Sequence, residues 1–370
     1  MYKTKGLKNS RIEVADALRG LAVAGIILFH SVEHFNTFAR DIKYTLPCDD
    51  TVFSVLQMLL SGKMYGIFAV LFGLSFFIMR DNQEQKGKDF SLRFAWRMVL
   101  LALFGLLNVC FYDGDILITY AILGLLLIPA GYLSNKWLWP ITILLLIQPL
   151  EIYSHLAGWH PDSRWVNMGY FKLMQGHDTF WHSAATNIQI GIKVTLGWFW
   201  FHGRITQTLG LFYLGLLIGR ARLFYNEADN LKKWRVILCV SALLVIVGAI
   251  VNFGKLDDLF RPMWNLAILM LIMSVAVLLW YRYKGFRSVF GKLGFFGRMS
   301  LTNYLLQSIL GSLLFYQWGF SLYNTLGTTY SALVGLGMIA FQYFLLKLWA
   351  DKHERGPLES VWRYLTWLKA

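Results

Sequence analysis

The sequence has few charged residues and few cysteines for its length. Only 15% of its 370 residues are Asp, Glu, Lys or Arg and 56% are hydrophobic, which excludes an ordinary soluble protein. The three cysteines lie far apart without CxxC spacing, so they predict neither a disulfide framework nor a zinc knuckle. The sequence also lacks a Walker loop, a GxSxG motif and a Gly-rich dinucleotide turn.

Long apolar runs predict helices that span a membrane. About 20 helical residues cross a hydrocarbon core, and the ten-residue alternation of an outer-membrane barrel is missing. No small-residue cleavage site follows the first apolar run, so we expect it to be a retained span. We predict an all-α polytopic membrane protein with ten spans, at about 15–36, 64–80, 93–111, 115–132, 137–154, 204–220, 236–253, 263–281, 298–318 and 328–350.

Several segments connect these spans. Gly62-Lys63 interrupts the apolar stretch 51–80, so 51–61 is predicted to be a helix on the outer surface. Residues 155–203 are expected to form an outer, partly interfacial cap, although whether 184–201 crosses the membrane stays open. A single transmembrane domain, 1–350, is then followed by a cytoplasmic amphipathic helix within 351–370.

The net charge of +14 raises the alternative of a nucleic-acid-binding protein. With loops placed alternately on the two sides, 24 of the 35 Lys and Arg residues fall on one side and nine on the other. This asymmetry follows the positive-inside rule. It predicts that both termini are cytoplasmic and that nucleic acid is not a partner.

The first span carries an unusual number of ionisable residues. Arg19 and His30 are eleven positions apart, which places them on one helix face and about 16 Å apart along the axis. Because charged groups inside a bilayer are costly, such a stripe predicts a functional site. The polar residues of this stretch are Asp16, Arg19, His30, Glu33 and His34.

The third span repeats the same interval, from Arg97 to Asn108. At the depth of His30, the Asn108 amide could hold the imidazole in one tautomer or bind an oxyanion. Arg19 and Arg97 would form a cationic mouth suited to phosphate groups. The alternative is that both arginines extend to the interface and that His30 is a packed polar residue.

Other polar residues extend this pattern. On the ninth span, Arg298 precedes Ser300, Asn303 and Gln307 on one face, which fits either ligand binding or hydrogen bonding between helices. Toward the outer side, a polar acceptor could meet Lys63, Asp113, Asp115 and Arg204, which otherwise serve as helix caps, turn formers or interface anchors.

Residues 30–34 also match H-x-x-E-H, a zinc-peptidase pattern. The pattern is short and no third carboxylate ligand is recognisable, so no metal site is predicted.

The sequence resembles the YeiB-like family of bacterial inner-membrane proteins over nearly its whole length. Six segments carry the resemblance, in order: RIEVADALRGLAVAGIILFH, SGKMYGIFAVLFGLSFFIMR, GLLNVCFYDGDILITYAILGLLLIP, LGLFYLGLLIGR, GRMSLTNYLLQS and RGPLESVWRYLTW. That family, a domain of unknown function, is thought to be related to membrane acyltransferases, including the acyltransferase-3 proteins and heparan-α-glucosaminide N-acetyltransferase. The resemblance implies a multi-pass protein of the bacterial inner membrane.

The acyltransferase-3 group is marked by an Arg-x10-His pair, and Arg19 with His30 looks like that pair. YeiB-like members often have Asn where this chain has His30 and His where it has Asn108. Such an exchange is expected if both positions face one cavity. The resemblance implies transfer of an acyl group, usually acetyl, from cytoplasmic acetyl-CoA to an acceptor at the outer face.

Two functional hypotheses follow. In the first, Arg19, Arg97, Arg298 and Asn303 hold acyl-CoA, and His30 acts as general base or carries the acyl group, with Asn108 orienting it and Glu33 nearby. Lys63, Asp113, Asp115 and His34 would contact a polar, glycan or lipid-linked acceptor. In the second, the same stripe lines the path of a transporter or channel for a small anion or metabolite. A non-catalytic membrane scaffold that uses the cap 155–203 as a binding surface is a further alternative. Membrane lipids are expected partners, and the sequence leaves open whether the protein forms a homodimer.

Overall fold

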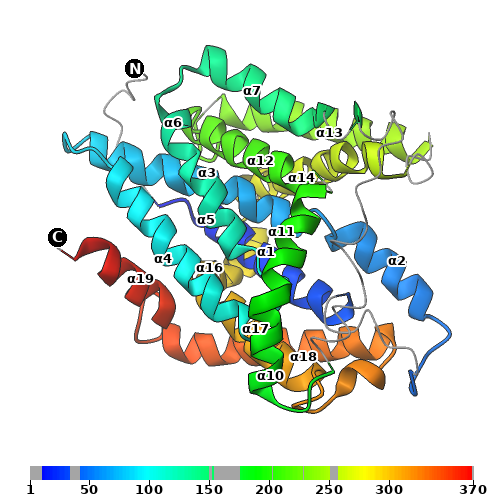
Figure 1. Cartoon of the computed structure of the whole chain (residues 1–370). Helices are drawn as coiled ribbons and strands as arrows, with labels where there is room; N and C mark the ends of the chain where they lie inside the picture. The colour runs from blue at the N-terminus through cyan, green and yellow to red at the C-terminus, as the bar shows by residue number, and fades with distance from the viewer. Residues whose placement is uncertain are drawn as a thin grey trace.

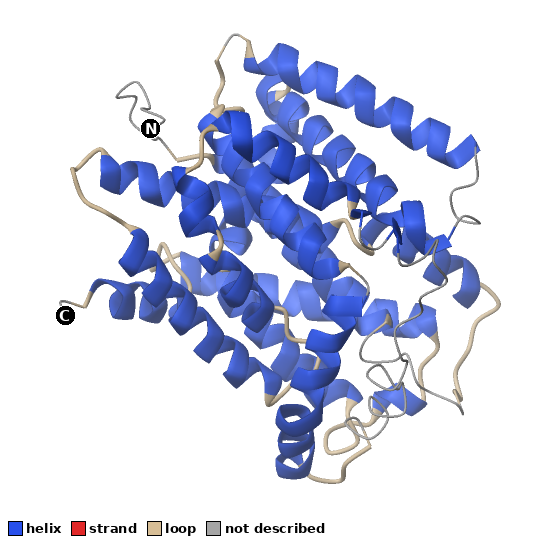
Figure 2. Ribbon diagram, turned by 45° about the horizontal axis from the view of Figure 1, so that its top comes forward, coloured by secondary structure: helices blue, strands red, loops and turns tan. Residues whose placement is uncertain are grey.

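A computed structural model describes residues 11–33, 42–149, 152–153, 176–201, 203–227, 229–250 and 257–368. Within these ranges the chain is helical and forms no strand, apart from an isolated bridge between Tyr44 and Leu326 (Figure 2). The predicted all-α class is therefore confirmed for the described part of the chain.

Figure 1 shows the described helices in their order along the chain. The first half comprises α1 (Glu13–Val32), α2 (Asp49–Leu60), α3 (Met64–Glu84), α4 (Ser91–Val109), α5 (Leu117–Leu125), α6 (Leu127–Tyr132) and α7 (Asn135–Ile147). The second half comprises α10 (Phe180–Thr186), the π-helix η2 (Asn187–Gly191), α11 (Ile192–Phe201), α12 (Arg204–Arg220), α13 (Asn230–Ile250), α14 (Asp257–Arg282), α15 (Lys284–Phe290), the 3₁₀ turn η3 (Gly291–Leu293), α16 (Gly294–Arg298), α17 (Ser300–Phe315), the 3₁₀ turn η4 (Leu322–Asn324), α18 (Thr328–Ala350) and α19 (Pro357–Trp367).

The core lies between α1, α3 and α12. Helix α12 is buried along almost its whole length and packs along α3. A Cβ on Gly73 of α3 would collide with the Phe212 carbonyl, and one on Gly215 of α12 would collide with the Val70 carbonyl. Glycine at these two positions therefore lets the backbones approach closely, as small residues do between membrane helices.

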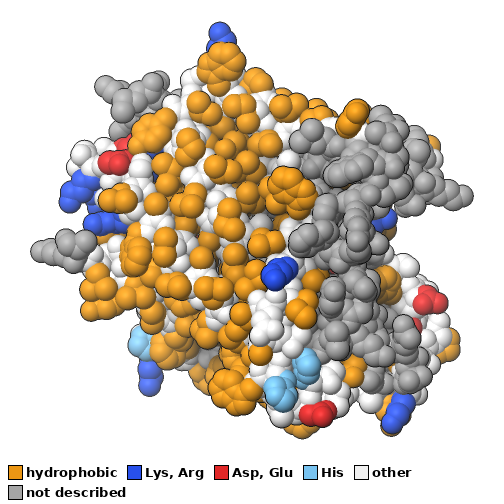
Figure 3. Space-filling view, in the orientation of Figure 1, with side chains coloured by type: hydrophobic (Ala, Val, Ile, Leu, Met, Phe, Trp, Pro, Cys, Tyr) orange, Lys and Arg blue, Asp and Glu red, His pale blue; other side chains and the backbone are white. Residues whose placement is uncertain are grey.

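Among the described residues, six helical segments are long and apolar enough to cross a membrane: Glu13–Val32, Asp49–Glu84, Ser91–Val109, Asn230–Ile250, Phe260–Arg282 and Thr328–Ala350. Large hydrophobic side chains are exposed on many helices, and they cover much of the face shown in Figure 3, with most charged groups near its rim. Lipid tails are the natural neighbours of such a surface. The chain is thus a multi-pass membrane protein.

The predicted breaks between helices agree with the structure. Helix α2 ends at Leu60 and α3 begins at Met64, with Gly62 at φ +75° between them. A second break lies at Asp113-Gly114-Asp115, between α4 and α5.

The predicted cap, 155–203, is described only from residue 176 onward. Its helices α10, η2 and α11 pack against α4 and α12, and Thr195 Oγ1 donates a 2.7 Å hydrogen bond to the Asp113 carbonyl. The described part of this segment therefore contacts the turn that the sequence places at the outer side.

Candidate functional site

Helix α1 carries the predicted polar stripe, and its N-terminal half is held by an ion pair. Arg19 Nη1 lies 3.0 Å from Asp16 Oδ1, and Arg19 Nη2 donates a 3.0 Å hydrogen bond to Ser75 Oγ of α3. Arg11 Nε also lies 3.0 Å from Asp16 Oδ2. The acids Glu13 and Asp16 occupy the first turn of α1, where the helix dipole favours negative charge.

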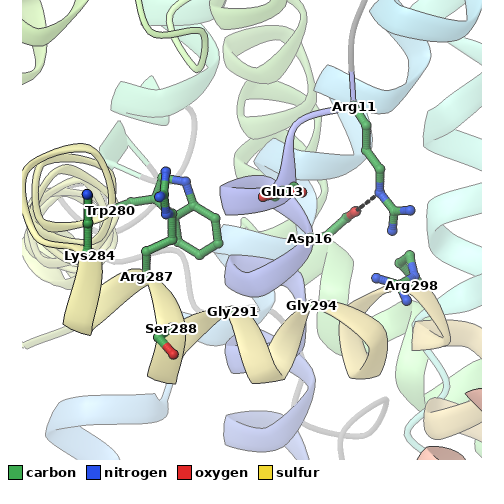
Figure 4. A pocket seen from close by; sticks show the side chains of 10 residues that line it. All are labelled: Arg11, Glu13, Asp16, Trp280, Lys284, Arg287, Ser288, Gly291, Gly294 and Arg298. Carbon is green, nitrogen blue, oxygen red and sulfur yellow. Dashed lines mark hydrogen bonds and ion pairs between the residues drawn. The ribbon is translucent and has the colours of Figure 1, made fainter. Parts of the chain in front are cut away.

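Beside this end of α1 the structure contains a cavity of about 430 Å³. Figure 4 shows Lys284 and Arg287 of α15 on one side, Arg11 and Arg298 on the other, and the acids of α1 between them. Four basic side chains thus face two acidic ones, so the cavity lining carries a positive balance. Such a lining suits an anion of nucleotide size.

The cavity depends on a close crossing of α1 and α16. A Cβ on Gly297 would collide with the Asp16 carbonyl oxygen, and one on Gly20 would collide with the Leu293 carbonyl oxygen. Glycine at both positions lets the η3–α16 segment lie directly on α1. This contact fixes Arg298 near Asp16, and Arg298 Nε also lies 3.4 Å from the Glu354 carbonyl oxygen.

At the opposite end of α1, His30 contacts two other helical regions. Its Nδ1 lies 3.3 Å from Gln307 Nε2 of α17, and its ring centroid lies 5.1 Å from that of Tyr112. Tyr112 is fully buried at the turn after α4, and Glu33 at the end of α1 is close enough for its charge to act on Tyr112. The imidazole is therefore held between α17 and the α4–α5 turn.

Asn108 lies one turn before Tyr112 and is completely buried. Its Nδ2 donates a 2.9 Å hydrogen bond to Asp115 Oδ1, and Asp115 Oδ2 accepts one of 3.0 Å from Ile118 N. Asn108 Oδ1 is buried and accepts no hydrogen bond from the described residues. Leaving such an oxygen unsatisfied costs about 1–3 kcal/mol, so Asn108 is suited to accept a hydrogen bond from a bound molecule.

The other acid of this turn, Asp113, is also buried but faces different partners. Tyr316 donates a 3.1 Å hydrogen bond from its hydroxyl to Asp113 Oδ1. On α17, the Tyr304 hydroxyl accepts one of 3.3 Å from Ile116 N. The structure therefore gathers Asp113 and Asp115 at one buried turn, as their sequence positions require, and connects that turn to α17 and the following loop.

Asn303 lies one turn from Gln307 on α17 and is fully buried. Its Nδ2 donates a 2.9 Å hydrogen bond to the Phe296 carbonyl, which ties α17 to α16. Within the described chain, Asn303 Oδ1 and Gln307 Oε1 are both buried without a donor. Together with His30 they give α17 a polar face against α1.

Arg97 lies apart from Arg19 and is covered by α19. Its guanidinium lies 4.1 Å from the centre of the Trp362 ring, and its Nη1 donates a 3.2 Å hydrogen bond to Thr366 Oγ1. Trp362 Nε1 donates a 3.2 Å hydrogen bond to the Arg97 carbonyl. The geometry thus places Arg97 in a contact with the C-terminal helix, whereas Arg298 lines the cavity beside α1.

The C-terminal helix is more than an amphipathic surface segment. Leu358 and Trp362 pack against the core, whereas Val361 and Leu368 are exposed. Glu359 accepts hydrogen bonds from Leu301 N, Thr302 N and Thr302 Oγ1, at 2.6, 3.0 and 2.6 Å. Because the first N–H groups of a helix have no partner within it, Glu359 caps α17 from another helix.

We expect Glu359→Ala to lower the free energy of unfolding by about 1–3 kcal/mol, because it leaves buried donors of α17 without an acceptor. Burial raises the pKa of this carboxyl above 4.5, and its hydrogen bonds oppose that rise. Chemical denaturation in detergent measures the change. Glu354→Ala, at an exposed side chain of the same tail, is the control, and equal stability of the two variants would contradict the capping role.

The remaining predicted residues lie elsewhere. Lys63 is buried at the start of α3, near Trp264 and Arg204 rather than at the His30 cluster. His34 lies outside the described residues.

The sequence reasoning missed several residues that the structure brings to these sites. Gln307 was recognised on the polar face of α17 but not as the partner of His30. Tyr112 directly precedes Asp113, which the sequence analysis had placed in a turn, so its place beside that turn could have identified it. Nothing in the sequence pointed to Lys284 and Arg287, which belong to one of several basic segments between spans. Only the tertiary fold brings them beside α1.

Comparison with known proteins finds one matching family and several relatives. Residues 218–369 match the family described as Protein of unknown function (DUF418). The chain is 28% identical to Uncharacterized protein YxaH of Bacillus subtilis, over 98% of this chain and 96% of that protein. It is 25% identical to Uncharacterized protein YeiB of Escherichia coli, over 95% of each chain. The chain is thus similar over nearly its whole length to these two uncharacterised proteins.

Proposed function

We propose that this protein is a membrane-bound acyltransferase. It would move an acyl group, most simply acetyl, from cytoplasmic acyl-CoA to an acceptor at the outer face. The observation that carries the proposal is the arrangement of α1, which lines a cationic cavity at one end and presents a held imidazole at the other. A donor bound at the inner end could in this way meet an acceptor from the other side.

The cavity supplies a place for the phosphate groups of CoA. Guanidinium and ammonium groups bind phosphate oxygens through charge-assisted hydrogen bonds. Arg11, Lys284, Arg287 and Arg298 provide such donors from three separate segments. Its volume of about 430 Å³ lies within the range of ligand sites, roughly 300–1,000 Å³. In this proposal the cavity residues take the phosphate role that the sequence analysis gave to Arg19, Arg97 and Arg298, and of these three only Arg298 lines the cavity.

The thioester would extend along α1 toward His30. From Asp16, the cavity residue of α1 nearest to His30 in sequence, the helix rises about 21 Å to His30, which is comparable to the length of a phosphopantetheine arm. The buried oxygen of Asn303 lies on the α17 face that reaches His30 and could accept a hydrogen bond from an amide group of that arm.

At the outer end, His30 would act as the general base. Rotation of the Gln307 side-chain amide exchanges the positions of its oxygen and nitrogen, so either atom can face His30 Nδ1. With the oxygen facing Nδ1, the imidazole carries its proton at Nδ1 and the lone pair at Nε2. Nε2 takes the proton of the acceptor hydroxyl or amine, the acceptor bonds to the thioester carbonyl carbon, and the C–S bond breaks. The CoA thiolate leaves and takes up a proton, while Asn108 Oδ1 helps hold the acceptor.

The donor site gives a direct prediction. Replacing Lys284 and Arg287 together by alanine should weaken CoA binding at least about tenfold, because each loses a charge-assisted hydrogen bond to phosphate. Isothermal titration of the purified protein with CoA measures the change.

The matched control is Lys292→Ala, which removes an exposed basic side chain of the same segment that does not line the cavity. Equal affinity in the double variant and the control would remove the cavity from the donor site. Solute flux into proteoliposomes without any CoA would instead favour a transporter.

A further inference from the structure

A second cluster of basic residues lies away from His30, at the ends of helices that the charge distribution places on the outer side. Lys63 precedes α3, Arg204 begins α12 and Arg261 lies in the first turns of α14. The charges of Arg204 and Arg261 both act on the Lys63 ammonium group. We call these three residues the outer cationic cluster.

Lys63 is the buried member of the outer cationic cluster. It is 3% exposed, and its Nζ lies 3.4 Å from the Gln57 carbonyl oxygen and 5.9 Å from the centre of the Trp264 ring. One long hydrogen bond and one distant ring compensate poorly for removing an ammonium group from water. A lysine that served as an interfacial anchor would extend its charge to solvent, which Lys63 does not.

Arg204, whose charge acts on the Lys63 ammonium group, has a hydrogen-bond donor without an acceptor among the described residues. Its Nη1 donates hydrogen bonds of 2.7 Å to Gln207 Oε1 and 3.2 Å to the Tyr65 hydroxyl. Its Nε is buried and has no acceptor among the described residues. No described carboxylate forms an ion pair with Lys63 or Arg204. The positive charge of this pair is therefore not balanced by the part of the chain that the structure describes.

Two neighbouring side chains of α14 also present unsatisfied polar atoms. Trp264 Nε1 is a buried donor without an acceptor, and Asn265 Oδ1 is a buried acceptor without a donor, within the described chain. Asn265 is 4% exposed, and its amide lies against Gly62, the residue before Lys63. Both side chains therefore face the same region as the Lys63 ammonium group.

The chemistry of these groups selects an anion with several acceptor oxygens. Lys63 Nζ, Arg204 Nε and Trp264 Nε1 are all donors, and two of the three belong to cations. A phosphate group offers enough oxygens for all of them, and an adjacent hydroxyl or amine could donate to Asn265 Oδ1. We propose that the outer cationic cluster, with Trp264 and Asn265, is a binding site for a phosphate group at the outer face, carried by a lipid headgroup or by a small soluble phosphate.

The test compares Lys63→Met with the full-length wild-type protein. Methionine keeps the volume of the buried side chain and removes its charge. Inorganic phosphate, titrated against potassium chloride of equal ionic strength, should raise the Tm of the wild-type protein. In Lys63→Met, the phosphate concentration needed for the same shift should rise at least about thirtyfold. Lys193→Met, at an exposed lysine of α11, is the matched control and should respond like wild type.

A second arm separates the two sources of phosphate. The proteins are extracted from nanodiscs of phosphatidylcholine with or without phosphatidylglycerol, and native mass spectrometry counts the retained lipid. Phosphatidylglycerol retained by wild type and lost in Lys63→Met assigns the site to a lipid headgroup, whereas a response to inorganic phosphate alone assigns it to a soluble ligand. Wild type and Lys63→Met behaving alike in both arms would overturn the proposal. CoA binding at the inner cavity is measured separately, so the two proposals fail independently.

Discussion

His30→Ala should lower the rate of acyl transfer by about 10²–10⁴-fold, because it removes the group proposed to take the acceptor's proton. The fold should survive, since His30 is only partly buried. Release of CoA thiol from acetyl-CoA by the purified protein in detergent, with a membrane extract as the source of acceptor, measures the rate.

The matched control is His353→Ala, at an exposed histidine that stacks on Trp349 in the C-terminal tail. It should retain wild-type activity and CoA affinity. An active His30→Ala variant would remove the imidazole from the reaction and leave Asn108 and Tyr112 as the remaining polar groups of that site.

Gly297→Val should destabilise the protein by about 3 kcal/mol, because the new side chain would meet the backbone of α1 at Asp16 and Gly20 rather than a movable side chain. The same collision would push α16 away from α1 and open the cavity between them. We expect a lower midpoint of chemical denaturation together with weaker CoA binding.

Gly294→Ala provides the comparison on the same helix, because the nearest atom to its Cβ is the flexible end of Arg298 at 3.9 Å. It should leave the stability close to that of the wild-type protein. If Gly297→Val were as stable as Gly294→Ala, the close crossing of α1 and α16 would be wrong.

The helices could be predicted from sequence because the relevant signals are local. An apolar run has the length of a span, and Gly62-Lys63 and Asp113-Gly114-Asp115 interrupt such runs where the structure has its breaks. The pairing of Asp16 with Arg19 was equally accessible, because residues three apart lie on one helix face.

The assembly of the sites was not local and could not be predicted in the same way. Arg97 has the same spacing to Asn108 as Arg19 has to His30, yet its guanidinium stacks on Trp362, 265 positions along the chain. The cavity joins Arg11 to Lys284 and Arg287 across a similar distance in sequence. Spacing within a helix fixes depth and face, whereas the partner on the neighbouring helix is decided by tertiary packing.

The most direct test of the central claim uses membrane vesicles of known orientation. Acetyl-CoA labelled in its acetyl group is added outside vesicles that carry the wild-type or His30→Ala protein. In inverted vesicles, where the cytoplasmic face is exposed, the account predicts labelled acetyl on a membrane-bound or enclosed acceptor with wild type and not with His30→Ala. Sealed right-side-out vesicles should give none. Equal labelling in both vesicle orientations would contradict transfer from the inner cavity to the outer face. The same conclusion would follow if folded wild-type protein gave no labelling in inverted vesicles supplied with a membrane extract.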